Sequence, residues 1–198
     1  MRLMLRFLVI VALLSGATSA ADRPDRQASD TSAERDLNLF HFVRIRYRGY
    51  GGFGFWGGGW VEPWAHDYPR AEQNLLRILG ELTLIPTRSD AYLILDLEDP
   101  RIMDYPMLYV SEPGYWDCTA QEVENLREYL LRGGFVLFDD FRDFRGEWEA
   151  FASCMQRVFP TRPLERLTEG HPIFHCFYDI ERLDMTPPYS VPGPPAFF

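Results

Sequence analysis

The pattern of apolar and polar positions predicts strands that alternate with amphipathic helices between residues 39 and 182. Apolar runs typical of strands occur at 39–47, 91–97, 107–110 and 135–138, with a shorter one at 164–167. Strands joined by helices of this length form right-handed parallel crossovers. The chain is therefore predicted to be an α/β protein, a three-layer sandwich with a mostly parallel central sheet of the flavodoxin-like kind.

Three helices are predicted between these strands, each from a 3.6-residue apolar period. Asp67 is expected to cap the first, with Pro69 in its first turn. Thr119 and Glu122 form a capping box at the start of the second, which Gly133 ends. The third carries apolar residues on one side, namely Trp148, Phe151, Met155 and Val158.

The run at 135–138 has no polar alternation and is followed directly by Asp139 and Asp140. Such a run predicts a strand buried on both faces, in the middle of the sheet. Ligands of parallel sheets bind at the carboxyl ends of the strands, where these two carboxylates are expected. The strand at 39–47 has a mixed second face, which fits either a position near a sheet edge or a strand whose end meets polar groups; that face holds Phe40, Phe42, Arg44 and Arg46.

Residues 48–60 form a glycine-aromatic loop, in which seven of thirteen residues are glycine. Large rings on a backbone with little conformational preference could cover a cleft or bind a ligand or partner. They could equally pack on the protein's own surface. The aromatic residues are Tyr50, Phe53, Phe55, Trp56 and Trp60.

The two ends of the chain differ from its middle. Residues 1–21 have a basic start, a short apolar stretch and small residues, which predict a cleavable signal peptide and a periplasmic or otherwise extracytoplasmic location. We expect a linker at 22–37, a single α/β domain at 38–183 and a Pro-rich, disordered tail at 184–198. The apolar stretch is too short to span a bilayer, so no stable membrane span is expected after cleavage.

Composition excludes several functions. The formal net charge is −9, which makes nucleic acid an unsuitable partner. The chain has no lysine, so Schiff-base and P-loop mechanisms are excluded. The three cysteines could form one disulfide and leave one thiol in an oxidising compartment, and Cys154 is expected to pack in the core. The other two are Cys118 and Cys176.

Several segments, in order, resemble a bacterial family known only as domain of unknown function 4159. They span about residues 39–182. The matching pieces are Phe42-Val43-Arg44 with Tyr47, His66-Asp67-Tyr68-Pro69, Asn74-Leu75, Tyr105-Pro106, Glu112-Pro113-Gly114, Arg132-Gly133-Gly134-Phe135, Asp139-Asp140-Phe141, Trp148, Val158-Phe159-Pro160 and His171-Pro172-Ile173-Phe174.

The resemblance implies the architecture of class I glutamine-amidotransferase-like domains, and it implies no reaction. Amidotransferases carry a nucleophilic cysteine on a sharp turn after a strand, which by pattern would be the strand at 135–138. Here that turn holds Asp139 and Asp140, and the chain has no G-x-C-x-G or G-x-S-x-G. The amidotransferase nucleophile is therefore absent.

Four residues are candidates for catalysis: Asp139, Asp140, His66 and His171. Carboxylates and imidazoles can act as bases or bind divalent cations. The alternative, which we expect, is that one carboxylate caps the backbone amides of the following turn or helix and the other pairs with an arginine such as Arg142 or Arg145. Asp67 would then cap a helix beside an exposed His66, and His171 would form a turn. Glu112 and Gly114, together with the loop aromatics, are the candidate binding residues.

These observations predict an exported, non-catalytic module that binds a small ligand or an envelope protein through the glycine-aromatic loop and the Asp139-Asp140 end of the sheet. The alternative is a metal-assisted hydrolase that uses Asp139 or Asp140 with His66 and His171. No cofactor is predicted for the module. The hydrolase would need a divalent metal.

Overall fold

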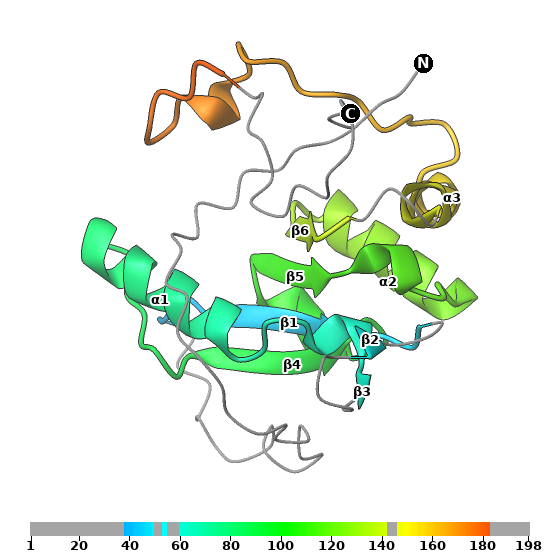
Figure 1. Ribbon diagram of the computed structural model, residues 1–198, viewed down its shortest axis with the longest axis horizontal. Helices are drawn as coiled ribbons and strands as arrows, with labels where there is room; N and C mark the ends of the chain where they lie inside the picture. The colour runs from blue at the N-terminus through cyan, green and yellow to red at the C-terminus, as the bar shows by residue number, and fades with distance from the viewer. Residues whose placement is uncertain (1–37, 50–52, 55–59, 142–145, 183–198) are drawn as a thin grey trace. The chain divides into compact units, whose positions relative to one another are not determined.

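The structure is a computed structural model that describes residues 38–49, 53–54, 60–141 and 146–182. These fall into two compact units, divided between Arg162 and Pro163 (Figure 1). The signal peptide, linker and tail predicted from sequence lie outside the described residues. The first unit contains the sheet and the three long helices, and the second contains a single turn of 3₁₀ helix.

The sheet of the first unit has four strands, all parallel, in the order β4-β1-β5-β6. They are β1 (Phe42–Arg46), β4 (Tyr92–Asp96), β5 (Met107–Ser111) and β6 (Phe135–Asp139). The chain moves from β1 outward to β4, then back across to β5 and β6. In chain order this is 2-1-3-4, the order of the first four flavodoxin-like strands.

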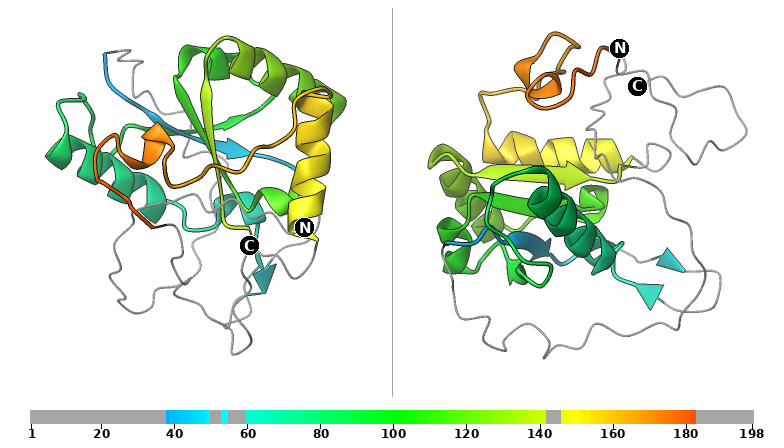
Figure 2. Two further views of the ribbon diagram at one scale, coloured as in Figure 1. Left: turned by 90° about the horizontal axis from the view of Figure 1, so that it is seen from above. Right: turned by 90° about the vertical axis from the view of Figure 1, so that its left-hand side faces the viewer.

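The helices lie on both faces of this sheet. Figure 2 shows α1 (Arg70–Leu82) on one face and α2 (Ala120–Leu131) and α3 (Glu147–Val158) on the other. This is the expected consequence of right-handed crossovers that leave the sheet centre in opposite directions. The predicted α/β class with three layers is confirmed.

Short elements connect these layers. An antiparallel pair within the glycine-aromatic loop joins β2 (Phe53–Gly54) to β3 (Trp60–Val61). Among its described residues, the first unit also has the 3₁₀ helices η1 (Pro63–Ala65), η2 (Pro100–Asp104) and η3 (Pro113–Tyr115). The second unit has η5 (Pro172–Phe174), and no strand forms at 164–167 within its described residues, contrary to the prediction.

The predicted place of β6 is wrong, because β6 was expected in the middle and is the last strand of the described sheet. Of the two alternatives for β1, the edge position is wrong, since β1 is central and buried, whereas polar partners do meet the strand at Arg44 and Arg46. Phe135 is 47% exposed. The mixed face of β1 misled the prediction because Arg44 is fully buried there and forms an ion pair with Glu72 of α1.

The helix ends follow local sequence where a cap can form. Thr119 and Glu122 form the predicted capping box, and Gly133 adopts φ 93° after α2. The prediction for Asp67 is wrong, because α1 begins at Arg70 and no side chain caps it. Asp67 instead has a left-handed backbone with φ 59°.

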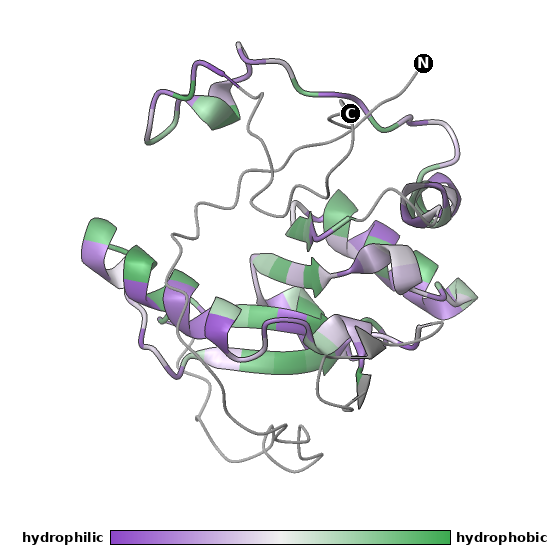
Figure 3. Cartoon of the chain, in the orientation of Figure 1, coloured by the Kyte–Doolittle hydropathy of each residue, from purple (hydrophilic) through white to green (hydrophobic). Residues whose placement is uncertain are grey.

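The core lies between the sheet and its helices. Figure 3 shows hydrophobic residues along the strands and mixed colouring on the helices. On the α1 face, Phe42, Leu76 and Tyr109 form one buried cluster. On the α2 and α3 side, Cys118 and Cys154 form a disulfide, and Cys176 is free. Cys154, whose expected role was core packing, is buried and also links α3 covalently to Cys118, which precedes α2.

Candidate functional site

The carboxyl ends of two neighbouring strands, β5 and β6, bring two acidic residues together. β1 and β5 are neighbours whose following connections go to opposite faces, and such a switch point is where ligands of open α/β sheets bind. The register pairs Ser111 with Asp139, and the Glu112 N–H donates to the Asp139 carbonyl at 2.9 Å. Glu112 and Asp140, the residues that follow, therefore share the rim.

A histidine from a third segment completes the cluster. His66 follows η1, and its Nδ1 lies 2.8 Å from Asp140 Oδ2 and 3.3 Å from Glu112 Oε1. The Glu112 side chain is fully buried, whereas those of His66 and Asp140 are 20% and 40% exposed. We call His66, Glu112 and Asp140 the rim cluster. It has a buried floor and an open side.

The three residues of the rim cluster could hold a metal ion. One nitrogen or oxygen atom from each lies within 4.8 Å of the other two. Ligands bound to zinc at about 2.0–2.2 Å are separated from each other by roughly 3–3.6 Å. The two contacts of His66 are close to that spacing. A nitrogen with two carboxylate oxygens suits Zn²⁺ or a similar first-row cation better than Ca²⁺, which prefers oxygen alone.

Charge at the rim changes proton affinities. The pKa of His66 is raised, first by the hydrogen bond to Asp140, with burial acting in the opposite direction. Burial raises the pKa of Asp139, and the neighbouring Asp140 adds to the effect. Burial, followed by the charge of Asp139, also raises the pKa of Tyr109. The negative charge at the rim therefore stabilises the protonated forms of these side chains, and a bound cation would be stabilised for the same reason.

The backbone around the rim cluster is unusual. Three non-glycine residues have positive φ, namely Asp67 at 59°, Glu112 at 50° and Asp140 at 66°. Left-handed backbone is rare for residues other than glycine, and each instance costs of the order of 1 kcal/mol or more. Two of these residues belong to the rim cluster and the third follows His66.

The expected capping role of the carboxylates is wrong for Asp140, whose side chain contacts His66. Asp139 does accept a backbone N–H, that of Asp140 at 2.9 Å, and its other oxygen accepts from the Tyr109 hydroxyl. His66 is partly buried rather than simply exposed. His171 lies in the second unit and accepts the Ile173 N–H, as expected of a turn residue.

The candidate binding residues lie in different surroundings. Glu112 is in the rim cluster, and its carbonyl accepts a hydrogen bond from the Tyr47 hydroxyl at 2.7 Å. Gly114 lies against α3, since a Cβ there would come 2.2 Å from the Glu147 Cβ. This contact accounts for the glycine by packing. Of the loop aromatics, Phe53 and Trp60 belong to β2 and β3, and the others lie outside the described residues.

Sequence reasoning missed three residues that support the rim cluster: Arg44, Glu72 and Tyr109. Arg44 donates to the carbonyls of Trp64 and His66 at 2.8 and 3.0 Å. An arginine among apolar strand residues was a visible signal, because a buried guanidinium requires a carboxylate partner. The sequence could not indicate which acidic residue supplied it.

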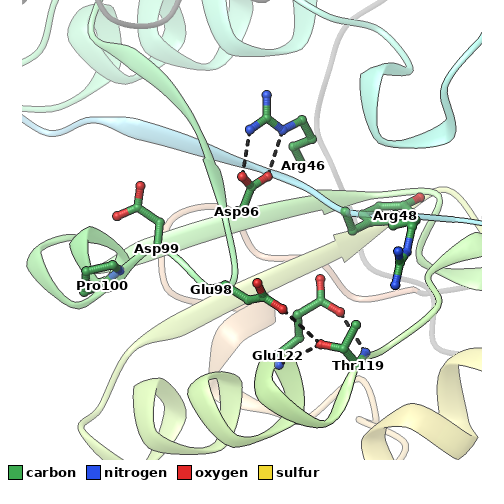
Figure 4. A pocket seen from close by; sticks show the side chains of 9 residues that line it. Arg46, Arg48, Asp96, Glu98, Asp99, Pro100, Thr119 and Glu122 are labelled. Atoms are coloured by element: carbon green, nitrogen blue, oxygen red, sulfur yellow. Dashed lines mark hydrogen bonds and ion pairs between the residues drawn. The ribbon is translucent and has the colours of Figure 1, made fainter.

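A polar cavity of about 620 Å³ opens beyond the ends of β1 and β4 (Figure 4). Arg46 and Asp96 line one side of it and form a bidentate pair with contacts of 2.7 and 2.8 Å. Thr119 and Glu122, at the start of α2, line another side. The remaining lining residues are Tyr47, Arg48, Glu98, Asp99 and Pro100. Tyr47 reaches from this cavity to the Glu112 carbonyl.

The fold and the site define a class: a parallel α/β domain with a histidine-carboxylate cluster at the carboxyl edge of its sheet. The chain belongs to the family described as Domain of unknown function (DUF4159), whose model matches residues 41–193. No protein with a curated description matches the chain. Among the described residues, no helix combines the length and apolarity needed to cross a membrane.

Proposed function

We propose that this protein binds a divalent cation at the rim cluster and uses it in hydrolysis. The observation that carries the proposal is the convergence of His66, Glu112 and Asp140 from three separate segments onto one point at the strand ends. Surface ion pairs rarely involve a fully buried carboxylate, because its desolvation is costly unless a cation compensates it.

The open side of the cluster supports a catalytic rather than a purely structural metal. Structural zinc sites have four protein ligands, whereas catalytic sites have three and leave a position for water or substrate. A divalent cation there would polarise a substrate oxygen and lower the pKa of a water molecule. Asp139 lies beside the cluster, and burial raises the pKa of its carboxyl group, which is the direction expected of a general acid or base.

Metal binding is tested with Zn²⁺ and Mn²⁺, by calorimetry and by the shift in thermal unfolding of the chain. Asp140→Asn and Glu112→Gln should each weaken Zn²⁺ binding by more than about tenfold, since each removes a charged ligand. The matched control is Asp179→Asn. Asp179 also contacts a histidine, His175, but this pair lies on an exposed surface and joins residues only four positions apart.

Three outcomes are informative. Zn²⁺ binding that both rim variants weaken and the control retains supports the metal site. Binding that the rim variants leave unchanged, or no binding by the wild-type chain, overturns it. Hydrolysis is tested with chromogenic carboxylic esters and phosphate diesters. If the protein binds metal but hydrolyses neither class of substrate, the proposal of a hydrolase is refuted and that of a ligand-binding module is retained.

The resemblance to glutamine-amidotransferase-like domains remains a prediction about architecture. Both turns with left-handed residues at the rim, after β5 and after β6, carry carboxylates, Glu112 and Asp140. Neither turn offers a thiol or hydroxyl nucleophile at that residue. This difference supports metal-assisted chemistry over covalent catalysis at the same edge of the sheet.

We infer an extracytoplasmic location, most simply the periplasm, with a small ligand or an envelope protein as partner. The signal-like pattern at 1–21 supports export. The Cys118–Cys154 disulfide supports it independently, because such links persist in oxidising compartments. The mass of the protein purified from the envelope tests this inference. A chain that retains residues 1–21 in the cytoplasm would refute it.

A further inference from the structure

Tyr109 holds one side of the rim cluster through Asp139. The Tyr109 hydroxyl donates to Asp139 Oδ2 at 2.9 Å, and Asp139 Oδ1 accepts the Asp140 N–H at 2.9 Å. Tyr109 is only 5% exposed, so the tyrosine has little freedom to leave this position. Asp140 has a φ of 66°, which a free backbone would seldom adopt. The hydrogen bond from the Asp140 N–H to the Asp139 carboxylate therefore helps to fix the backbone position from which the Asp140 side chain extends.

Arg44 holds the opposite side through the backbone of the η1 segment. Its Nη1 donates to the carbonyls of Trp64 and His66 at 2.8 and 3.0 Å, and its Nε donates to Glu72. Arg44 and Glu72 are fully buried. One guanidinium thus connects the central strand, the first helix and the residue that supplies the imidazole.

The two supports are in contact with each other. The Arg44 guanidinium carbon lies 4.8 Å from the centroid of the Tyr109 ring. We propose that Arg44 and Tyr109 are positioning residues that together set the contact between His66 and Asp140. This inference rests on the proposed metal site. It adds a reason why that site is preformed, because the residues that hold its two sides, Arg44 and Tyr109, are buried and stack on each other.

Outer hydrogen-bond partners of metal ligands typically change affinity by about 10–100-fold when they are removed. Tyr109→Phe removes the hydroxyl and keeps the ring beneath Arg44. We expect this change to weaken Zn²⁺ binding by about tenfold. Asp139 loses the hydrogen bond from the Tyr109 hydroxyl, and the backbone of Asp140, which Asp139 holds, is then less well fixed.

Tyr129→Phe is the matched control. Tyr129 is also buried, at 2% exposure, and its hydroxyl donates to the Tyr105 carbonyl at 3.0 Å. Its hydroxyl contacts the carbonyls of Tyr105 and Phe135, and neither residue belongs to the rim cluster. The control should leave the Zn²⁺ dissociation constant within about twofold of the wild-type value, even if it lowers the thermal unfolding temperature.

A second measurement does not depend on metal. Because His66 Nδ1 lies 2.8 Å from Asp140 Oδ2, we expect the imidazole N–H at Nδ1 to give a hydrogen-bonded proton signal by NMR in the metal-free protein. Tyr109→Phe should broaden or shift that signal, and Tyr129→Phe should not. If the wild-type chain binds no Zn²⁺, the metal proposal fails while this signal still tests positioning. The positioning inference is overturned if Tyr109→Phe leaves the His66 signal unchanged, or if both variants alter it equally.

Discussion

Two histidine-aspartate contacts, one in each unit, show what makes such a pair a candidate site. His66 and Asp140 lie 2.8 Å apart, and His175 and Asp179 lie 2.6 Å apart. The shorter contact is a local i,i+4 pair in which Asp179 is 81% exposed. The longer contact joins residues 74 positions apart and has the buried Glu112 beneath it.

The difference lies in what holds the two partners. The surface pair depends on its own local backbone and on one carbonyl, that of Glu169. The pair at the rim is held by a central strand, an edge strand and a buried ion pair. A short distance is therefore weak evidence of function. Geometry imposed by residues far apart in the chain is stronger evidence, because local structure alone would not maintain it.

The largest expected effect concerns the ion pair beneath the rim. Arg44→Met leaves the Glu72 carboxylate buried without its partner, which should lower the free energy of unfolding by about 3–5 kcal/mol. Arg46→Met is the control on the same strand. Arg46 and Asp96 are 43% and 47% exposed, so their pair should contribute no more than about 1 kcal/mol.

Urea denaturation of both variants measures the two free energies. Equal losses would show that burial of the Arg44–Glu72 pair does not distinguish it from an exposed pair. The contrast between the buried support of the rim cluster and the exposed pairs would then have no measurable difference in stability behind it.

A smaller effect is expected from close packing beside the rim. In Gly114→Ala the new Cβ would come 2.2 Å from the Glu147 Cβ and 2.7 Å from its Cα, so η3 or α3 must move. Overpacking of this kind costs about 1–3 kcal/mol. Gly170→Ala, in the second unit, meets nothing within 4 Å and should change stability by less than about 0.5 kcal/mol.

Thermal unfolding of these two alanine variants provides the measurement. A Gly114 variant as stable as the wild-type chain would show that α3 can move away from η3 at no cost. The turn after Glu112 would then not be held rigidly by its packing against α3.

The smallest expected effect is a dependence of stability on pH. The folded-state pKa of His66 is raised, chiefly by the hydrogen bond to Asp140, so the folded chain binds this proton more tightly than the unfolded chain. The resulting stabilisation is complete below the unfolded value of about 6.5 and is lost as the pH rises through the raised folded value. With a chelator present, His66→Gln should therefore lose more stability at about pH 5.5 than at about pH 9.

His175→Gln is the comparison for this measurement. The pKa of His175 is also raised, by its hydrogen bond to Asp179, but the pair faces solvent and is screened. We expect its effect on the urea midpoint to be nearly independent of pH. A loss that grows with pH in the His66 variant would mean that the sign of the linkage is wrong.

Several features of the fold were predictable from sequence because their causes are local. Thr119 and Glu122 satisfy each other's backbone amides across three residues, so the start of α2 could be identified directly. The alternation of strands and helices predicted a parallel sheet through the handedness of crossovers, and the sheet is parallel. Asp140 and Glu112 were also identified as candidates, because acidic residues at strand ends mark the ligand edge. His66 was identified because an imidazole can act as a base or bind a cation.

The order of strands and the partners of the candidates were decided by tertiary structure. Arg44 made β1 resemble an edge strand, and only the approach of Glu72 shows how a charge can be buried in the central strand. Asp140 was expected to cap a backbone amide or to pair with an arginine, and the 74 residues between it and His66 concealed their contact. Local sequence determines periodicity and caps through contacts a few residues apart, whereas a site built from three segments exists only after the sheet has aligned its strand ends.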